Sequence, residues 1–458
     1  MTLRHALASL LLLGAVPALA AGRVPYGGEL RVAHTGPAEP GEPALADSPT
    51  EATLLGLVSR SACRLAPDGQ PSPALAREVT RPSAQVVRLT LPSPAQANAL
   101  SRAWTRLTGP ESPSPYRALL FPLRADGRQL SATGDSLELV LAFPWPDLER
   151  ALCHPALALP RTSPAVLGPF SALGPTAVEA RLAWAEGRPY LDRLRLTATD
   201  ERGLARLWTS QQAQVALGVL PDTDTSAGAA LYATYLAWSP RRVPSDFRQA
   251  VESAIDREDL TRLFVRGPAV PMPYLLPPAL LPQPQGARPT PPPPSQGGRK
   301  VTLLYDAGSE DQRAVAERLQ VKLYERGYAV ALEPLPRASL RARWAAGEYE
   351  LMLHSLLLPP VPGPALAVVL DAAGRKDLLG VELPRIGTLA DPVARDARAR
   401  ERALALAASV PMLPLYAQGL ALRAAPEVGG LVFDAQGLPL LDGAWLQPAV
   451  TGVPGARR

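Results

Sequence analysis

The sequence predicts an α/β protein, and three observations support this prediction. From Val301 to Leu353 the chain alternates strand and helix patterns, in the order strand, helix, strand, helix, strand, with short connections. Residues 186–217 show a strand, a polar turn, a helix and another strand, in which Leu194 and Leu196 alternate and Leu204 begins a helical spacing. Such alternation builds sheets covered by helices. The length of 458 residues allows two or three domains.

The N-terminus has the pattern of a secretory signal peptide. Arg4 and His5 precede an apolar run, Ala6–Val16, which is followed by the A-x-A motif Ala18–Ala20. The run is too short for a permanent membrane span, and no cysteine follows the motif as a lipid-anchored protein would require. We expect cleavage after about Ala20 and export to the periplasm. The alternative is an amphipathic helix of a cytosolic protein.

The composition argues against a nucleic-acid partner and shows one proline-rich segment. The net charge is +5, and the basic residues are scattered without an accompanying aromatic series, so we expect no nucleic-acid partner. The chain has 53 prolines, many of them in the tract 268–294. We interpret this tract as an extended spacer or covering loop; a ligand for a proline-binding domain is the alternative.

The chain contains two cysteines, Cys63 and Cys153. In an oxidising compartment an even number of cysteines favours a disulfide, and two buried free thiols are the alternative. A metal site would need further ligands at fixed spacing. His154 adjoins Cys153 but no other ligand does, so we expect no metal and no cofactor.

The first half of the chain gives these elements in order. Leu30 and Val32 alternate with Glu29 and Arg31 and predict a half-buried strand. The further expected elements are a short helix at 54–58, a hairpin within 63–78 that turns at Asp68-Gly69, a strand at 85–91, a helix at 94–107 and strands at 137–143 and 178–184.

In the second half, Ser309 and Gln312 form a capping box, and Gly327 ends the helix that they begin. The other expected elements are strands at 231–238, 301–305, 328–332, 349–353 and 413–422, and helices at 247–260, 339–346 and 391–408. Residues 351–370 are as apolar and as long as a membrane span. Four prolines between Pro359 and Pro364 predict instead a strand followed by an irregular loop.

Several of these segments resemble a known family. EGRPYLD at 186–192 resembles the family segment "yw-x-G-x-P-x-l-d", and FRQAVESAIDREDL at 247–260 resembles "vRqAi-x-x-AiDRe-x-l". GGELRVAH at 27–34 and the 63–78 hairpin match in the same order. The family is solute-binding protein family 5, the dipeptide- and oligopeptide-binding subunits of ABC importers. The resemblance extends with gaps over nearly the whole chain after residue 20 and is poorest at 95–167, and this chain is shorter than most members.

The resemblance implies a two-lobed periplasmic-binding-protein fold of type II-like organisation, with a discontinuous first lobe and a ligand cleft between the lobes. The expected parts are a signal peptide at 1–20, lobe 1 at 21–238 with a small inserted subdomain at about 85–167, lobe 2 at 239–412 with the proline-rich loop 268–294, and a return to lobe 1 at 413–458.

It also implies the function: capture of a peptide or peptide-like solute by lobe closure, for delivery to an inner-membrane ABC permease, by a monomer. Two alternatives remain open. The first is a homologue that has lost transport and acts as a scaffold or sensor partner. The second is a periplasmic hydrolase, which is disfavoured because no G-x-S-x-G elbow, H-E-x-x-H motif or phosphate-binding loop is present. We therefore expect that the chain is not an enzyme.

For the ligand site we predict six residues on segments that the resemblance places at or between the lobes: His34, Trp238, Ser239, His354, Ser355 and Tyr416. Trp238 and Tyr416 have packing in a lobe core as their alternative role. His34 has an ordinary exposed loop as its alternative.

Specificity is expected to differ from that of peptide-binding relatives. Those relatives commonly have an acidic residue in "w-x-aD" after the strand "yDl", and it pairs with the peptide's amino terminus. Here 349–353 matches the strand, but no acid follows before Asp371. A buried ammonium without a carboxylate is costly. We expect an uncharged or N-blocked ligand, unless Asp371 folds into the same place.

Overall fold

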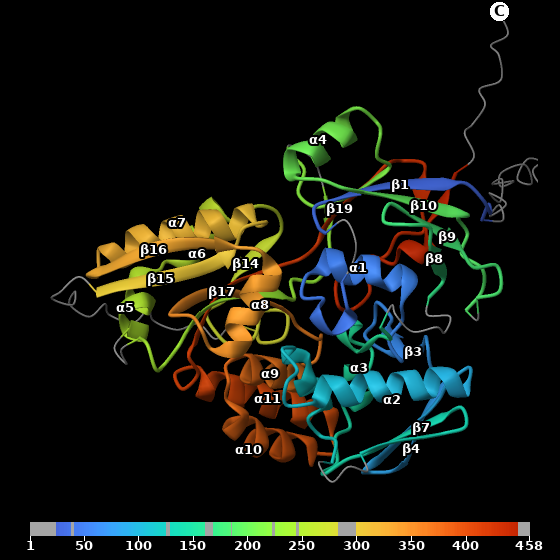
Figure 1. The fold of residues 1–458 in the computed structure, drawn as a ribbon, viewed down its shortest axis with the longest axis horizontal. Coiled ribbons are helices and arrows are strands. Elements are labelled where there is room, and N and C mark those ends of the chain that lie inside the picture. The colour runs from blue at the N-terminus through green and yellow to red at the C-terminus, as the bar shows by residue number, and fades with distance from the viewer. Residues whose placement is uncertain are drawn as a thin grey trace, which may run out of the picture.

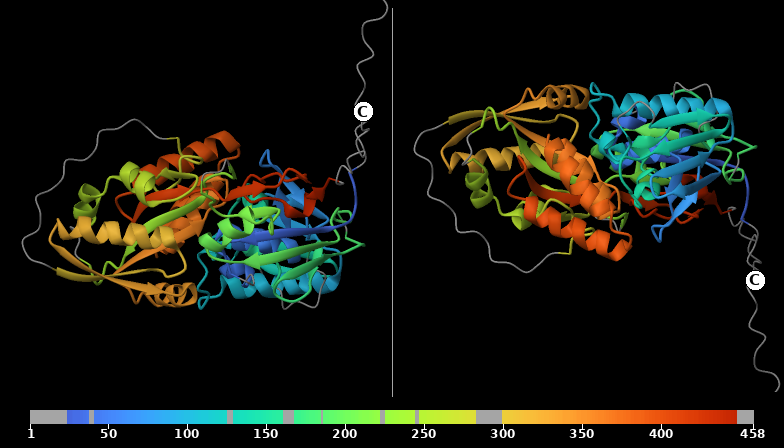
Figure 2. Two further views of the ribbon diagram at one scale, coloured as in Figure 1. Left: turned by 90° about the horizontal axis from the view of Figure 1, so that it is seen from above. Right: turned by 90° about the horizontal axis from the view of Figure 1, so that it is seen from below.

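The computed structural model describes residues 24–37, 41–124, 129–160, 168–184, 186–221, 225–243, 247–282 and 299–447. Two bodies lie side by side, each built around one large sheet, and a third, smaller sheet lies beside the first (Figures 1 and 2). We call the part built on the seven-stranded and four-stranded sheets lobe 1, and the part built on the six-stranded sheet lobe 2. The signal-peptide segment 1–20 and residues 283–294 of the proline-rich tract lie outside the described residues.

The seven-stranded sheet of lobe 1 has the strand order β12-β19-β11-β1-β10-β9-β8. Leu30 and Val32 of β1 pack with Leu54 in the core under helix α1, while Ala33, on the opposite face, packs with Leu204 of α4. The predicted alternation of this strand is therefore used on both faces. The bounds are β1 Glu29–His34, β8 Phe170–Ala172, β9 Ala177–Ala180, β10 Arg193–Ala198, β11 Val215–Leu217, β12 Ser226–Ala227, β19 Ala421–Ala424, α1 Pro49–Val58 and α4 Glu201–Thr209.

The inserted part of lobe 1 is an antiparallel sheet of order β4-β5-β7-β6, packed on one amphipathic helix. Ser93 caps that helix by accepting a hydrogen bond from Gln96 N. Its elements are β4 Glu78–Ser83, β5 Val86–Thr90, β6 Leu130–Thr133, β7 Ser136–Val140 and α2 Pro94–Thr108, followed by η2 Pro115–Leu120, α3 Leu148–Ala151 and η3 Pro155–Leu157. Before it come η1 Pro43–Leu45 and the hairpin of β2 Cys63–Leu65 and β3 Pro71–Pro73.

Lobe 2 is a mixed sheet of order β14-β18-β13-β17-β15-β16, in which β15 pairs in parallel with both β16 and β17. Ser309 accepts a hydrogen bond from Gln312 N at 3.2 Å, as the capping box predicted. The bounds are β13 Tyr232–Trp238, β14 Ala269–Pro271, β15 Arg299–Asp306, β16 Tyr328–Leu335, β17 Leu351–Leu357, β18 Met412–Gln418, α5 Phe247–Ala254, α6 Arg257–Phe264, α7 Glu310–Tyr324, α8 Arg337–Ala346, α9 Pro362–Ala372, α10 Lys376–Gly387 and α11 Pro392–Leu406.

The expected irregular loop after β17 is wrong. Helix α9 begins at Pro362, and each of its residues is buried. Pro362 and Pro364 lie in its first turn, where the backbone N–H groups have no intrahelical acceptor, so a missing N–H costs little there. Among the described residues, no helix is long and apolar enough to cross a membrane.

The two sheets are joined twice, once before β13 and once between β18 and β19. Gly228 and Gly419 bring these connections into backbone contact, and Gly437 of the C-terminal segment packs on Gly228. A Cβ added to Gly419 would lie 2.2 Å from the carbonyl oxygen of Gly228, and one added to Gly228 would lie 2.1 Å from that of Gly437. Any side chain at these positions would therefore separate the connections. The last described elements, β20 Val428–Gly429, η4 Leu441–Gly443 and β21 Trp445–Leu446, lie beside lobe 1 (Figure 1).

Strands β13 and β18 both pair within the six-stranded sheet along their length. The expected lobe boundaries at 238 and 412 thus fall at the ends of these two strands that point away from lobe 1, and the exact division of the chain stays a prediction. Cys63 and Cys153 form a disulfide, with Cα atoms 4.5 Å apart. It ties the β2–β3 hairpin to the turn after α3.

Candidate ligand site between the lobes

The carboxyl ends of parallel strands from both sheets meet at the boundary between the lobes. On the lobe 1 side β1 ends at His34 and β10 leads into α4, while on the lobe 2 side β15 ends at Asp306 and β17 ends at Leu357. Ligands of open α/β sheets bind outside such carboxyl ends. The polar side chains that gather here therefore define the candidate site.

Arg337, at the start of α8, connects the two lobes at this boundary. Its guanidinium lies 3.2 Å from Asp47 Oδ1 of lobe 1 and 2.8 Å from Asp306 Oδ2 of lobe 2. Arg341, one turn later, lies 3.4 Å from Asp47 Oδ2 and donates to the carbonyl of Leu45. Burial alone would lower the pKa of Arg337, but the charges of Asp47 and Asp306 outweigh it and raise that pKa.

A second ion pair joins the two lobes, separate from the one made by Arg337. Arg266, after α6, pairs with Glu201 at the start of α4 and lies 3.5 Å from Asp311 of α7. Gln418 Nε2 donates to the second oxygen of Asp311 at 2.8 Å. Burial raises the pKa values of Glu201 and Asp311, and the charge of Arg266 opposes it in both.

Between these ion pairs lies a network of hydroxyl groups centred on Ser355 of β17. Its Oγ is 2.9 Å from Thr234 Oγ1 and accepts from Gln312 Nε2 at 3.0 Å. Gln312 Oε1 in turn accepts from the backbone N of Asp306. Tyr416 hydrogen-bonds to Thr234, and burial raises its pKa. The structure thus brings together two of the predicted residues, Ser355 and Tyr416.

The two predicted histidines lie at the same strand ends but face different surroundings. His34 is fully buried, on the face of β1 that also carries Val32, and no described residue hydrogen-bonds to either ring nitrogen. His354, on the opposite face of β17 from Ser355, stacks on Trp344 with ring centres 5.1 Å apart. Burial lowers the pKa of both imidazoles to about 4, and in His354 the charge of Asp47 opposes this shift.

Trp238 and Ser239 lie elsewhere. They follow the far end of β13, about 20 Å from Tyr232 at the usual rise per strand residue. Trp238 packs edge-on against Phe247 and under the guanidinium of Arg248, in the core beneath α5 and α7. The backbone N of Ser239 donates to the carbonyl of Glu350. For Trp238 this is the core-packing alternative, and neither residue is brought to the Ser355 network.

The sequence reasoning missed the charged residues of the site. Asp306 and Arg337 each follow a predicted strand, β15 and β16, and Asp47 precedes the helix cap Ser48. A rule that inspects polar residues directly after parallel strands would have selected the first two. Glu201 follows the parallel strand β10 and carries the same signal, whereas Asp47 carries none, because no strand precedes it directly.

Asp371, the acid considered for ligand recognition, has a different partner. It is 3% exposed, and Arg117 of η2 lies 2.9 Å from its Oδ2. Burial raises the pKa of Asp371, which Arg117 opposes. Acids do reach the boundary, but Asp47 and Asp306 are both engaged by Arg337. Among the residues that the structure describes, no group of three or more His, Cys, Asp or Glu is placed to hold a metal ion.

Comparison with known proteins identifies the fold. No family model and no curated protein sequence matches the chain. The periplasmic binding protein DppA of Helicobacter pylori, solved with the peptide STSA, is similar with a TM-score of 0.75 and 16% identity, over 93% of this chain and 99% of that one. The murein tripeptide binding protein MppA of Escherichia coli is similar with a TM-score of 0.74 and 17% identity, over 92% and 99%. The chain has the two-lobed fold of periplasmic binding proteins, as predicted.

The arrangement of the lobes can also be compared. An unliganded open form of MppA superposes less well, with a TM-score of 0.58 and 15% identity over 92% of this chain and 98% of that one. The same protein thus matches at 0.74 in one structure and at 0.58 in its open form.

Proposed function

We propose that this chain captures a peptide or peptide-like solute between its lobes and delivers it to an inner-membrane ABC permease. The observation that carries the proposal is the boundary where Asp47 of lobe 1 meets Arg337 of lobe 2 around the Ser355 hydroxyl network. Such a site assembles only when both lobes contribute, which is how a closing binding protein senses its ligand.

Several further parts belong to the same proposal. The protein is exported, loses its signal peptide, works in the periplasm as a monomer and catalyses no reaction. DppA and MppA, which bind a peptide and a murein tripeptide, support the ligand class. Ser355, Tyr416, His34 and His354 are proposed to line the site, together with Arg337.

Native mass spectrometry of the protein purified from its own periplasm tests the proposal. We expect an added mass of a small solute that is released on denaturation and identified after release. Ser355→Ala and Arg337→Ala should retain less of it, whereas Arg262→Ala, an exposed arginine paired only within α6, should retain as much as the wild type. Failure to find a ligand there, combined with no calorimetric signal from peptide mixtures, would contradict the proposal.

Specificity gives a sharper test. Because Asp371 is bound to Arg117 and Asp47 and Asp306 are bound to Arg337, we expect no strong preference for a free amino terminus. Calorimetric titration should compare matched free and N-acetylated di- to pentapeptides. A preference for the free amine that disappears in Asp371→Asn would contradict this expectation and show that Asp371 recognises the amino terminus.

A further inference from the structure

The last residue of β17, Leu357, is held from the other lobe through its backbone. Its N–H donates to the hydroxyl of Tyr116 at 3.0 Å, and its carbonyl oxygen lies 3.0 Å from Nε2 of His154. Leu357 belongs to lobe 2, whereas Tyr116 and His154 belong to the inserted part of lobe 1. Strand β15 pairs with β17 at Leu351 and Met352, so the edge of β17 at Leu357 is free for these side chains.

The protonation state of His154 is fixed by its second nitrogen. Nδ1 accepts a hydrogen bond from the backbone N of Ala156 at 3.1 Å, so the proton is on Nε2, which donates to Leu357. The imidazole is therefore neutral and uses both nitrogens. Its ring lies against that of Tyr116, with centroids 4.7 Å apart, and the disulfide at Cys153 anchors the same turn.

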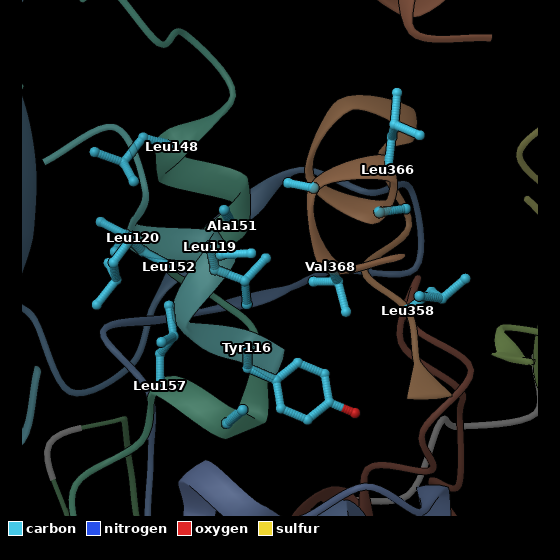
Figure 3. Close-up of a cluster of buried hydrophobic side chains, with 14 of the residues drawn as sticks. Tyr116, Leu119, Leu120, Leu148, Ala151, Leu152, Leu157, Leu358, Leu366 and Val368 are labelled. Atoms are coloured by element: carbon cyan, nitrogen blue, oxygen red, sulfur yellow. The ribbon is translucent and has the colours of Figure 1, made fainter. Parts of the chain in front are cut away.

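An apolar core lies around Tyr116, as Figure 3 shows, with side chains of lobe 1 on one side and of α9 and its preceding loop on the other. Each side chain is at most 1% exposed. We call it the interlobe core, and its residues are Tyr116, Leu119, Leu152, Leu157, Leu358, Leu366 and Val368.

Two ion pairs cross the same boundary beside the interlobe core. Arg117 of η2 pairs with Asp371 of α9, and Arg395 of α11 pairs with Asp147 at 3.0 Å, with both side chains of the second pair at most 6% exposed. Separating the lobes here would expose apolar side chains and remove the partners of these charges. Interfaces between domains that move freely are more polar than this one.

We propose that Tyr116 and His154 form a latch on Leu357 that keeps the two lobes closed when no ligand is bound. This inference depends on the lobe movement of the proposed function but goes beyond it, because it assigns the closing contact to the chain itself. Ligand would then enter during brief openings and act on an already closed resting state. The latch is a backbone clamp, so it acts regardless of the side chain at position 357.

The latch has a built-in response to acid. A protonated imidazole cannot accept from Ala156 N, so His154 must stay neutral while the lobes are closed. Burial lowers its pKa to about 4, which the hydrogen bond to Leu357 opposes, whereas an exposed imidazole titrates at about 6.5. The titratable groups around the pair are Tyr232 on β13 and Asp47 and Glu51 beside α1, all acting on Tyr116. Each pH unit below about 6.5 should favour opening by up to about tenfold, until about pH 4.

Ligand-free protein, stripped by unfolding and refolding, should be examined by small-angle X-ray scattering and by amide hydrogen exchange at Leu357. At pH 7.5 the wild type should have the radius of gyration of the closed structure, and Tyr116→Phe/His154→Ala should have a larger one. Tyr235→Phe is the matched control, since its hydroxyl donates to Leu275 within lobe 2. Tyr116→Phe alone, which removes one oxygen, should raise exchange at Leu357 at least tenfold while leaving the fold intact.

His154→Gln separates the latch from general acid effects. A glutamine amide can donate to Leu357 and accept from Ala156 without titrating, so this variant should stay closed at pH 5 where the wild type opens. An open wild type at pH 7.5, or a double variant that is as compact as the wild type with unchanged exchange at Leu357, would overturn the latch. No ligand is present in these measurements, so a failed search for ligand would count against the proposed function alone.

Discussion

At the scale of single residues, Arg337 joins a carboxylate of lobe 1 to a carboxylate of its own lobe. It is the common partner of Asp47 and Asp306, and Arg341 assists it at Asp47. Arginine suits this position because its planar guanidinium presents several donors in fixed directions. Lysine would supply the charge but could not reach both carboxylates in this geometry.

Replacing Arg337 by Met should therefore destabilise the protein. Asp306 is 6% exposed and would lose its charged partner, at a cost of about 2 kcal/mol in the free energy of unfolding, since Arg337 itself is partly solvated. Urea unfolding at pH 7 measures the change. Arg262→Met, at an exposed pair within α6, serves as control and should have little effect. Equal effects of the two substitutions would mean that Arg337 contributes only as a surface charge.

His34 should make the folded protein sensitive to acid. Its pKa is lowered by burial to about 4 in the folded state and is about 6.5 in the unfolded chain. Above pH 6.5 both states are neutral and no pH dependence arises. Between 6.5 and 4 only the unfolded chain binds the proton, so folding loses up to about 1.4 kcal/mol per pH unit.

The test is the difference between the wild type and His34→Gln, because burial raises the pKa of Asp434 to about 7, which acts in the opposite sense in both proteins. The stability gap should move by about 2–3 kcal/mol in favour of the variant between pH 6.5 and 4.5. Parallel stability curves in urea would show that His34 titrates in the folded protein as it does in the unfolded chain.

The sequence could predict the position of a site residue only where a local pattern determines the strand or helix that carries it. Ser355 and Tyr416 were selected because the family resemblance places their segments at or between the lobes, and pairing in one sheet brings them to a common network. Trp238 lies on β13, the strand between theirs, but the distance along β13 separates it from them. No local pattern encodes the approach of Asp47 to Arg337, because 290 positions of sequence separate the two.

At the scale of elements, α9 shows that the effect of a proline on a helix depends on its position in that helix. Prolines within a helix break it, whereas Pro362 and Pro364 occupy the first turn and leave the rest of the helix free to form. The hydrophobicity of 351–370 matches that of a membrane span, and the sequence cannot show that neighbouring elements bury every side of α9. Strands and helices with clear caps and alternation, such as α2 and α7, were predicted within a few residues.

Helix α9 should be as sensitive to truncation as a central core element. Leu366→Ala removes a fully buried side chain from the interlobe core and should cost about 2–5 kcal/mol in the free energy of unfolding. Leu404→Ala, at a 36% exposed position of α11, is the matched control and should cost less than about 0.5 kcal/mol. Chemical denaturation of both variants decides. A small loss for Leu366→Ala would indicate that the helix can relax into the space.

At the scale of the whole molecule, the disulfide closes a long segment of lobe 1. Cys63 and Cys153 are separated by 90 residues, so the chain-entropy model gives the bond up to about 4–5 kcal/mol of stabilisation. Cys63→Ala/Cys153→Ala should unfold at lower denaturant by a corresponding amount, and reduced wild type should behave alike. Labelling of unfolded, unreduced protein should find no free thiol. Two labelled thiols per chain would refute the pairing in the protein as produced.

The architecture as a whole was within reach of sequence because it repeats local patterns. Alternating strands and helices, together with ordered family-like segments, predicted two lobes that share a divided chain. The contact between the inserted part of lobe 1 and helices α9–α11 was not predicted. It joins surfaces from segments whose patterns, taken separately, are those of ordinary amphipathic elements, and only the assembled fold determines that they meet.

The glycines at the two connections give this arrangement a mechanical meaning. Gly228, Gly419 and Gly437 meet backbone to backbone, so no side chain of these residues stands between the connections. The contacts that resist opening lie elsewhere, at Leu357 with the interlobe core and at the ion pairs between the lobes. The hinge at the two connections and the latch on Leu357 are thus separate parts of the molecule. Loss of a single hydroxyl at the latch, that of Tyr116, should therefore change the opening between the lobes, whereas substitutions within one lobe should have little effect on it.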